Sequence, residues 1–331
     1  MSTPSQIAET IHANGHDVIL LHNEVLIAPF CGRVLAVGPA GGENAIWTNP
    51  AFEAGDTTEA LLSGEGWLNH GGDRIWVSPE METHIEDPAR MFETYAVASE
   101  VDPGSYVVTS QDDDAVTIRS TGAPLFKQSR RRVDLDWEQR IACMHRPAEL
   151  NDTVAFAGYR TSTTLRASDF APTQPALWRL LQVPGGGTIT VTTKPGTSPL
   201  TLFGKPALTE TDDGLTCKVD TDEFYKFAID HRDATGVMRY RRDGDTESDL
   251  IIRKFTTVPG AVYSDVPNFD LEKRGYVVQI YVDDGGFGGF GELEHHSPAL
   301  HGDKTEVIDI CETEVYRGPA SEIDRLCQPQ A

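Results

Sequence analysis

Residues 236–255, GVMRYRRDGDTESDLIIRKF, decide the fold class of this 331-residue chain. Two arms rich in strand-forming residues flank the turn-forming pair Asp243-Gly244. Apolar and aromatic arms on either side of an Asp-Gly turn are typical of a β-hairpin. The stretch therefore predicts two antiparallel strands, and similar segments occur on both sides of it.

Short strand-like segments separated by turn residues recur along most of the chain. Several alternate apolar and polar residues with a period of two, and Gly, Pro and Asp stand between them. This rhythm predicts an all-β fold, a large antiparallel β-sandwich with a few short helices, because two such sheets can bury their inner faces against each other. The expected strands lie within residues 17–30 (a hairpin turning near His22 to Glu24), 33–39, 95–120 (three strands), 133–144, 188–204, 236–255, 275–283, 290–296 and 305–315.

Helical patterns are few and short. Residues 3–15 combine a Thr or Ser cap, an Ile7–Ile11 stripe and a Gly15 stop, which predicts an N-terminal helix within residues 1–15. The segments GDTTEALLS (55–63) and PASEIDRLC, within the C-terminal residues 319–331, predict two more. No regular alternation of strands with long helices occurs and no linker divides the chain, so we expect a single domain over residues 1–331.

The charge balance is strongly acidic. The chain has 28 Lys and Arg against 51 Asp and Glu, a formal net charge of −23 at pH 7. Such a surface repels phosphate backbones, which argues against nucleic acid as a partner. No run of about 18 apolar residues predicts a membrane span, and the N-terminus lacks the pattern of a secretory signal.

The five cysteines are widely spaced and form no C-x-x-C motif. This spacing argues against a zinc ribbon or a redox pair and favours buried, reduced thiols. Reduced thiols fit a reducing compartment, so we expect a cytoplasmic protein. The expected state is a monomer or a weak dimer.

One polar and aromatic cluster in the sequence points to a ligand site. The stretch WLNHGGDRIWVSPE places His70 before a glycine pair, followed by Arg74, Trp76 and Glu80. The glycines permit a backbone bend and the close approach of a ligand. Arg74 offers a planar set of donors for hydroxyl or carboxylate oxygens, and Trp76 offers a flat apolar face for a sugar ring. A structural His70, a core Trp76 and an Arg74–Glu80 ion pair are the alternatives.

A second cluster lies in the expected strand FGELEHH. Successive side chains of a strand point to opposite faces, so Glu292, Glu294 and His296 share one face, and Leu293 and His295 share the other. Unpaired buried charge is costly. We therefore expect the Glu-Glu-His face to line a polar cleft or to pair with Arg, with an exposed strand face as the alternative.

Three segments resemble the galactose mutarotase (aldose 1-epimerase) superfamily. They are NHGGDRIWVSPE (69–80), PALWRLLQVPGGGTITV (175–191) and GFGELEHHSPAL (289–300). The resemblance implies the sandwich fold of that superfamily, a small-molecule carbohydrate as partner, and no cofactor or metal. The Leu-Glu element of mutarotases matches Leu293-Glu294, which implies that Glu294 is the general base, with His70 as a candidate acid.

The chain departs from the mutarotase pattern in the middle segment. Mutarotases carry a second His there as general acid, whereas this chain has Trp178 and Gln182, neither of which can donate a proton as an acid. The substrate-binding residues that the two clusters and the resemblance imply are Arg74, Trp76, Glu80, Gln182, Glu292 and His296.

These observations leave several functions open. The first is an aldose 1-epimerase-like isomerase that acts on a sugar or sugar derivative by general acid/base chemistry. The second is a carbohydrate-binding protein without turnover. The third is a polysaccharide lyase or glycoside hydrolase on the same fold, with Glu80 and Glu294 as its two carboxylates. A metal site is the weakest alternative, because adjacent His residues on a strand point to opposite faces; its ligands would be His295, His296, His301 and Asp303.

Overall fold

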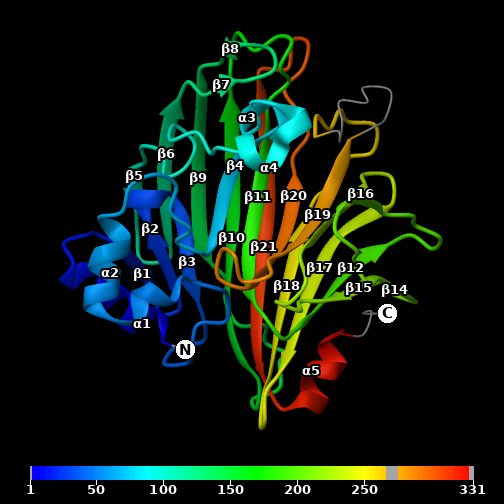
Figure 1. Ribbon diagram of the computed structural model, residues 1–331. Coiled ribbons are helices and arrows are strands. Elements are labelled where there is room, and N and C mark those ends of the chain that lie inside the picture. Colours follow the sequence, from blue (N-terminus) through cyan, green and yellow to red (C-terminus); the bar gives the residue numbers. More distant parts are fainter. Residues whose placement is uncertain (1, 266–274, 328–331) are drawn as a thin grey trace.

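The structure, a computed structural model, describes residues 2–265 and 275–327. Two large antiparallel sheets make up most of it (Figure 1). Among the described residues, nine strands form one sheet in the order β1-β2-β3-β4-β11-β20-β19-β16-β13, and ten form the other in the order β14-β15-β12-β17-β18-β21-β10-β9-β6-β5. The all-β antiparallel sandwich predicted from the strand and turn pattern is confirmed.

The element bounds show how each sheet is assembled from distant parts of the chain. The nine-stranded sheet contains β1 (Ile19–Leu21), β2 (Val25–Ala28), β3 (Arg33–Val37), β4 (Asp73–Ser78), β11 (Ala176–Pro184), β20 (Phe290–His296), β19 (Tyr276–Val282), β16 (Tyr225–Asp230) and β13 (Leu200–Phe203). The ten-stranded sheet contains β14 (Thr209–Thr211), β15 (Gly214–Lys218), β12 (Thr188–Thr193), β17 (Ala234–Asp243), β18 (Ser248–Phe255), β21 (Glu306–Gly318), β10 (Ala155–Arg166), β9 (Leu135–Cys143), β6 (Ala115–Gly122) and β5 (Val107–Gln111). A separate small pair is formed by β7 (Leu125–Phe126) and β8 (Arg131–Arg132).

The helices lie on the outside of the two sheets (Figure 1). The three that the sequence predicts are present, and a capping box of Thr3 and Gln6 begins the first one. Residues 328–331 of the expected C-terminal tail lie outside the described residues. No helix in the described part of the chain is long and apolar enough to cross a membrane. The α-helices are α1 (Pro4–Ala13), α2 (Gly55–Leu62), α3 (Glu80–Thr83), α4 (Met91–Thr94) and α5 (Ala320–Cys327).

The prediction of three strands within residues 95–120 is wrong for the first of them. Tyr95 makes only an isolated bridge to Ile85, and the following residues turn instead of joining a sheet. The Ala96 backbone N–H donates to His84 O at 2.8 Å, and the Ala96 carbonyl accepts from Lys127 Nζ at 2.9 Å. These bonds use the backbone groups that a sheet partner would need, so the segment covers the nine-stranded sheet instead of extending it.

An apolar core fills the space between the sheets, and a buried ion network lies within it. Asp73 accepts hydrogen bonds from Tyr159 Oη at 2.8 Å and from Arg253 Nη2 at 3.1 Å, both of them on the ten-stranded sheet. Arg179 lies 3.4 Å from Asp73 and 3.5 Å from Asp309. The network ties β4 and β11 to the opposite sheet, so it fixes the strands that carry the two polar clusters.

All five cysteines are unpaired, and Cys31, Cys217 and Cys311 are buried. Burial raises the pKa of the Cys31 and Cys311 thiols to about 12, so both stay protonated at neutral pH. The expectation of buried thiols therefore holds for three of the five cysteines, whereas Cys143 and Cys327 are partly exposed.

Candidate functional site

A sharp backbone bend leads into β4. Gly71 and Gly72 have φ values of +88° and +81°. A Cβ on Gly72 would lie 2.4 Å from Val34 O, and one on Gly71 would lie 2.6 Å from Thr48 Cα. Only glycine fits such a position, so the pair sets the direction in which the strand starts.

Arg74 and Trp76 of the first predicted cluster lie on the same face of the nine-stranded sheet as Glu294 and His296 of the second. Cross-strand pairing places Arg74 opposite Leu180 and Leu180 opposite Glu294. In the next row, Trp76 pairs with Trp178, which pairs with His296. The neighbours Asp73 and Arg179 point into the core, so this polar face is the outer one, directed away from the ten-stranded sheet.

Arg74 and Glu292 form the first half of the site. Arg74 Nη2 donates to Glu292 Oε1 at 2.8 Å, and Gln182 Nε2 donates to the same oxygen at 2.8 Å. The Arg74 guanidinium also lies 4.3 Å from the Trp76 ring centroid. The expected Arg–carboxylate pairing therefore occurs, with Glu292 and not Glu80 as the partner.

Glu294 and Lys226 form the second half. Glu294 Oε2 accepts from Trp178 Nε1 at 2.8 Å and lies 3.2 Å from Lys226 Nζ. The same ammonium lies 3.2 Å from Glu80 Oε2 and 4.7 Å from the Trp178 ring centroid. Lys226, on β16, thus joins the two carboxylates that the sequence singled out.

The His296 ring lies in the row of the sheet that contains Trp76 and Trp178. It stacks on Trp178 with centroids 5.5 Å apart, and its Nε2 lies 3.8 Å from Asp265 Oδ2. Gln279 Nε2 donates to that oxygen, and the Glu80 backbone N–H donates to Asp265 Oδ1 at 2.8 Å. Asp265 therefore links the sheet to the segment that begins at Glu80.

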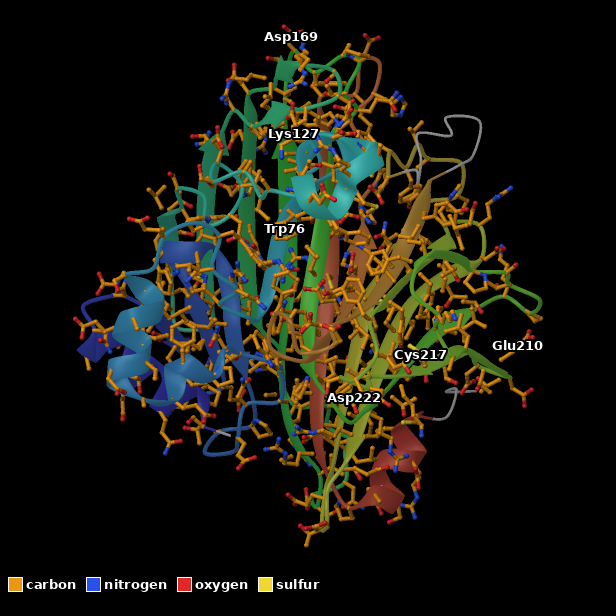
Figure 2. All side chains as sticks on the ribbon, viewed as in Figure 1. Trp76, Lys127, Asp169, Glu210, Cys217 and Asp222 are labelled. Carbon is orange, nitrogen blue, oxygen red and sulfur yellow. The ribbon has the colours of Figure 1, made fainter. Side chains whose placement is uncertain are left out.

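The segment that contains α3 and α4 covers these residues. In Figure 1 the two helices stand in front of the upper part of β4 and β11, and Figure 2 labels Trp76 near the centre of the molecule. Tyr95 Oη donates to Glu80 Oε1 at 3.1 Å, and the His84 ring lies 4.8 Å from the Trp76 ring. Phe92 packs on Phe203 with centroids 5.3 Å apart. This cover leaves the site enclosed: Arg74 is 4% exposed and Glu294 is 0% exposed.

Buried polar atoms without a hydrogen-bond partner gather beneath this cover. Buried polar groups in proteins are usually hydrogen-bonded, so each unpartnered group here is free to bind water, an ion or a polar ligand. Within the described part of the chain, the unpartnered atoms here are Arg74 Nε and Nη1, both ring nitrogens of His84, Gln182 Oε1, Gln279 Oε1, Glu294 Oε1 and both ring nitrogens of His296.

Burial shifts the protonation of these groups. It raises the pKa of Glu294 to about 8; the Lys226 ammonium opposes this rise and Glu292 adds to it. Burial lowers the pKa of His84 to about 3 and holds that of His296 well below its usual value, so both rings are neutral near pH 7. Burial alone would lower the pKa of Lys226, but Glu294 and the other carboxylates raise it above its ordinary value.

The structure does not bring the His70 ring into this cluster. The ring packs against Phe30 and Phe52, with centroid distances of 5.8 and 6.1 Å. Among the described residues it makes no hydrogen bond or ion pair with Arg74 or Glu294. Burial lowers its pKa to about 3, and it lies beside the bend as a neutral, packed ring.

Several residues of the site were not predicted from the sequence. Lys226 carries one usable signal: in YKFAID it alternates with Tyr225, Phe227 and Ile229, which places a lysine on the face opposite these three apolar side chains. The other unpredicted residues sit in loops or short turns, or show no polar alternation, and are His84, Tyr95, Asp265 and Gln279.

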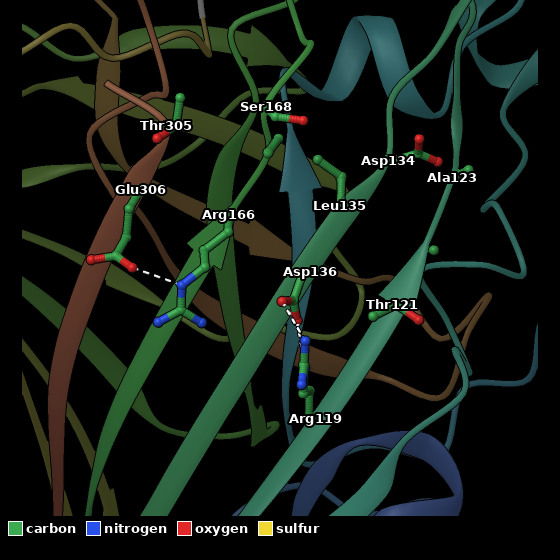
Figure 3. Close-up of a pocket in the computed structure, with 12 residues that line it drawn as sticks. Arg119, Thr121, Ala123, Asp134, Leu135, Asp136, Arg166, Ser168, Thr305 and Glu306 are labelled. Carbon is green, nitrogen blue, oxygen red and sulfur yellow. Dashed lines mark hydrogen bonds and ion pairs between the residues drawn. The ribbon is translucent and has the colours of Figure 1, made fainter. Parts of the chain in front are cut away.

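A groove of about 690 Å³ lies on the outer face of the ten-stranded sheet (Figure 3). Two ion pairs lie in it: Arg119 Nη2 is 2.7 Å from Asp136 Oδ2, and Arg166 Nε is 2.7 Å from Glu306 Oε2. These side chains are partly exposed ion pairs on a solvated sheet face. The groove therefore lacks the unpartnered buried groups that distinguish the site under α3 and α4.

Comparison with known proteins relates the chain to one fold. No protein-family model and no curated protein sequence matches it. The structure of a galactose mutarotase-like protein from Lactobacillus casei ATCC 334 matches with a TM-score of 0.51 and 14% identity, covering 90% of this chain and 100% of that one. The chain is thus similar in fold to a galactose mutarotase-like protein, and the fold implied by the sequence resemblance is confirmed.

Two other solved structures match over similar lengths. The Slr1438 protein from Synechocystis sp. PCC 6803 has a TM-score of 0.47 and 10% identity, with 89% of this chain and 91% of that chain covered. A galactose 1-epimerase from Lactobacillus acidophilus NCFM has a TM-score of 0.41 and 8% identity, with 89% and 91% covered.

Proposed function

We propose that this protein binds a small sugar on the outer face of the nine-stranded sheet and interconverts its two anomers, as an aldose 1-epimerase does. The observation that carries the proposal is the state of Glu294. One carboxylate oxygen is held by Trp178 and Lys226, the other is buried without a partner, and the pKa is raised to about 8. A buried carboxyl group with a pKa near the working pH is suited to general base catalysis.

The surrounding residues fit a sugar ring. Arg74, Gln182 and Glu292 form one hydrogen-bonded group with donors and acceptors left over for hydroxyl groups. Trp76 and Trp178 add an aromatic wall to the site, with Arg74 over the first ring and Lys226 and His296 against the second. The fold similarity to a galactose mutarotase-like protein supports a sugar as the ligand class.

The reaction requires two proton transfers. Glu294 Oε1 removes the proton of the anomeric hydroxyl while an acid protonates the ring oxygen, so that the C1–O5 bond breaks and C1=O1 forms. Rotation about C1–C2 and reversal of both transfers close the ring as the other anomer. The site residues are buried, so the sugar enters when the cover formed by α3 and α4 moves away from the sheet.

The direct test is anomer exchange followed by NMR for a panel of neutral aldoses, amino sugars and uronic acids. Glu294→Gln keeps the shape of the side chain and removes the base, so turnover should fall by ~10²–10⁴-fold. Affinity for the sugar should change only a few-fold. Glu306→Gln, which alters a partly exposed carboxylate paired with Arg166, is the matched control. Full activity of Glu294→Gln would show that Glu294 is not the base.

Sugar binding without turnover is the second candidate. It is favoured by the middle segment, which has Trp178 and Gln182 and no His, and in which Trp178 holds Glu294 by a hydrogen bond. Wild-type protein that binds an aldose and accelerates no anomer exchange would replace the isomerase by a binding protein. Glu80 and Glu294 share the Lys226 ammonium, so release of reducing ends from aryl glycosides should be measured alongside and would indicate a glycoside hydrolase.

A further inference from the structure

We propose that Lys226 is the catalytic acid that works with Glu294, in place of the histidine that the middle strand lacks. The inference rests on the proposed anomer exchange and names the group that protonates the ring oxygen. Lys226 would be a catalytic residue, because its ammonium would contact the reacting oxygen directly.

The position of the ammonium carries the inference. Lys226 Nζ lies 3.2 Å from Glu294 Oε2 and 4.7 Å from the centroid of Trp178, a residue of the middle segment that lacks the histidine. The two oxygens that exchange protons in an aldose, O1 and O5, are bonded to the same carbon. The acid and the base must therefore be neighbours, and within the described residues Lys226 is the cation that contacts Glu294.

The other proton donors near Glu294 fit the role less well. Burial keeps His84 and His296 neutral, so neither carries an imidazolium proton at neutral pH. The Tyr95 hydroxyl already donates its proton in a hydrogen bond to Glu80, so it is not directed at a sugar oxygen. The His70 ring is packed against Phe30 and Phe52, outside the cluster.

The proton balance closes within the enclosed site. In ring opening, Glu294 gains the proton of O1 and the Lys226 ammonium gives one to O5, which leaves a neutral carboxylic acid and a neutral amine. In ring closure, the amine takes the O5 proton back and the carboxylic acid returns a proton to O1. Both groups regain their starting states, with no proton taken from solvent and no co-reactant.

The charge of Glu294 couples the two transfers. The Glu294 carboxylate is the largest of the interactions that raise the pKa of Lys226. When that carboxylate accepts a proton its charge disappears, so the Lys226 ammonium becomes a stronger acid at the moment when O5 needs the proton. Glu80 remains beside Lys226 and holds the amine in place.

The test compares Lys226→Arg with Lys226→Ala. Arginine keeps the positive charge and the ion pairs but is not deprotonated in proteins. We expect Lys226→Arg to lower kcat by ~10²–10⁴-fold while sugar affinity changes a few-fold. Lys226→Ala should lose similar activity, and methylammonium should restore part of it in proportion to its concentration, whereas guanidinium should not. Lys254→Arg, a lysine paired with Glu314 on the ten-stranded sheet, is the matched control.

The outcomes distinguish the acid role of Lys226 from the proposed isomerase activity. Near wild-type kcat in Lys226→Arg, with Glu294→Gln inactive, would overturn the role of Lys226 and leave the isomerase intact. A wild-type protein that exchanges no anomers would overturn both. If Lys226→Arg fails to fold, as thermal melting would show, the alanine variant decides alone: an activity that methylammonium does not restore contradicts an acid role.

Discussion

Arg74 and Glu292 form a buried 2.8 Å ion pair although 218 positions separate them in the chain. They stand on β4 and β20, which do not touch, because β11 lies between them. Gln182 of β11 donates to the same Glu292 oxygen and completes the link across three strands. The site is therefore assembled by sheet pairing, so anything that shifts one of these strands alters the positions of its neighbours' side chains.

The first prediction concerns pH. Only the carboxylate form of Glu294 can accept a proton, and burial raises its pKa to about 8. The rate of anomer exchange should therefore rise as the pH increases through about 8, and the residual rate of Glu294→Gln should lack this rise. Exchange rates measured by NMR between slightly acidic and alkaline pH check this. A wild-type rate that is flat across this interval would contradict the assignment of the base.

The raised pKa of Glu294 also predicts how the stability of the fold depends on pH. The folded state holds a proton on Glu294 up to about pH 8, whereas the unfolded chain releases it near 4.5. The stabilising contribution of that proton is complete below 4.5 and is lost as the pH rises through the folded pKa. Urea unfolding of Glu294→Gln should therefore show a smaller loss of stability between these two pH values than the wild type shows. Identical pH profiles for the two proteins would show that Glu294 is ionised throughout.

A second pair of variants tests the bend before β4. Gly72 (φ +81°) and Gly186 (φ +87°) have nearly the same φ, but of the two only Gly72 would bring an added Cβ against a backbone oxygen, at 2.4 Å. Gly186→Ala should cost about 1–2 kcal/mol for the left-handed conformation. Gly72→Ala should cost more than about 3 kcal/mol, because a contact with Val34 must also be relieved. Equal losses in urea unfolding would show that the close approach has no energetic effect.

The ion network between the sheets allows a further comparison. Asp73 is the ion-pair partner of Arg253, and both side chains are fully buried. Asp73→Asn leaves that guanidinium without a counter-charge and should destabilise the fold by about 3–5 kcal/mol. Asp136→Asn changes the partly exposed pair with Arg119 (Figure 3) and should cost less than about 1 kcal/mol. A small effect at Asp73 would mean that water or the nearby Asp309 carboxylate compensates for the lost charge.

The net charge predicts a response to salt. At −23 the folded surface repels itself more strongly than the expanded chain does. Salt at 0.1 M screens charges beyond about 10 Å, so the melting temperature should rise between low and moderate NaCl. Sucrose at matched osmolality controls for general solute effects. A melting temperature that stays constant in NaCl would count against net repulsion as a limit on stability.

Alternation along a strand made one half of the site predictable. Glu292, Glu294 and His296 share a face because the side-chain period of a strand is two, and that face is the polar one in the structure. The partners were not predictable in the same way. Lys226 meets Glu294 because of the strand order β16-β19-β20, which no local pattern encodes. Asp265 and Tyr95 reach Glu80 from loops, where the backbone path depends on tertiary contacts.

For His70, the sequence predicts the backbone conformation but not the direction of the side chain. The glycine pair after it marks a bend, and the bend is present with both glycines at positive φ. The direction of the His70 ring depends on Phe30 and Phe52, which lie in separate 3₁₀ turns beneath α1 and α2. The short His-Gly-Gly motif therefore predicts the shape of the backbone, whereas packing against other elements decides which way its side chains face.

The strands β4, β11 and β20 carry essential groups on both of their faces. Trp178 faces the site and Arg179 faces the core. Inserting or deleting one residue in β11 would exchange the two, placing a guanidinium above the sheet and an indole in the ion network. We therefore expect length variation among related chains to occur in loops such as 283–289, and these three strands to change by substitution. Alignments that open a gap inside them can be rejected on that ground alone.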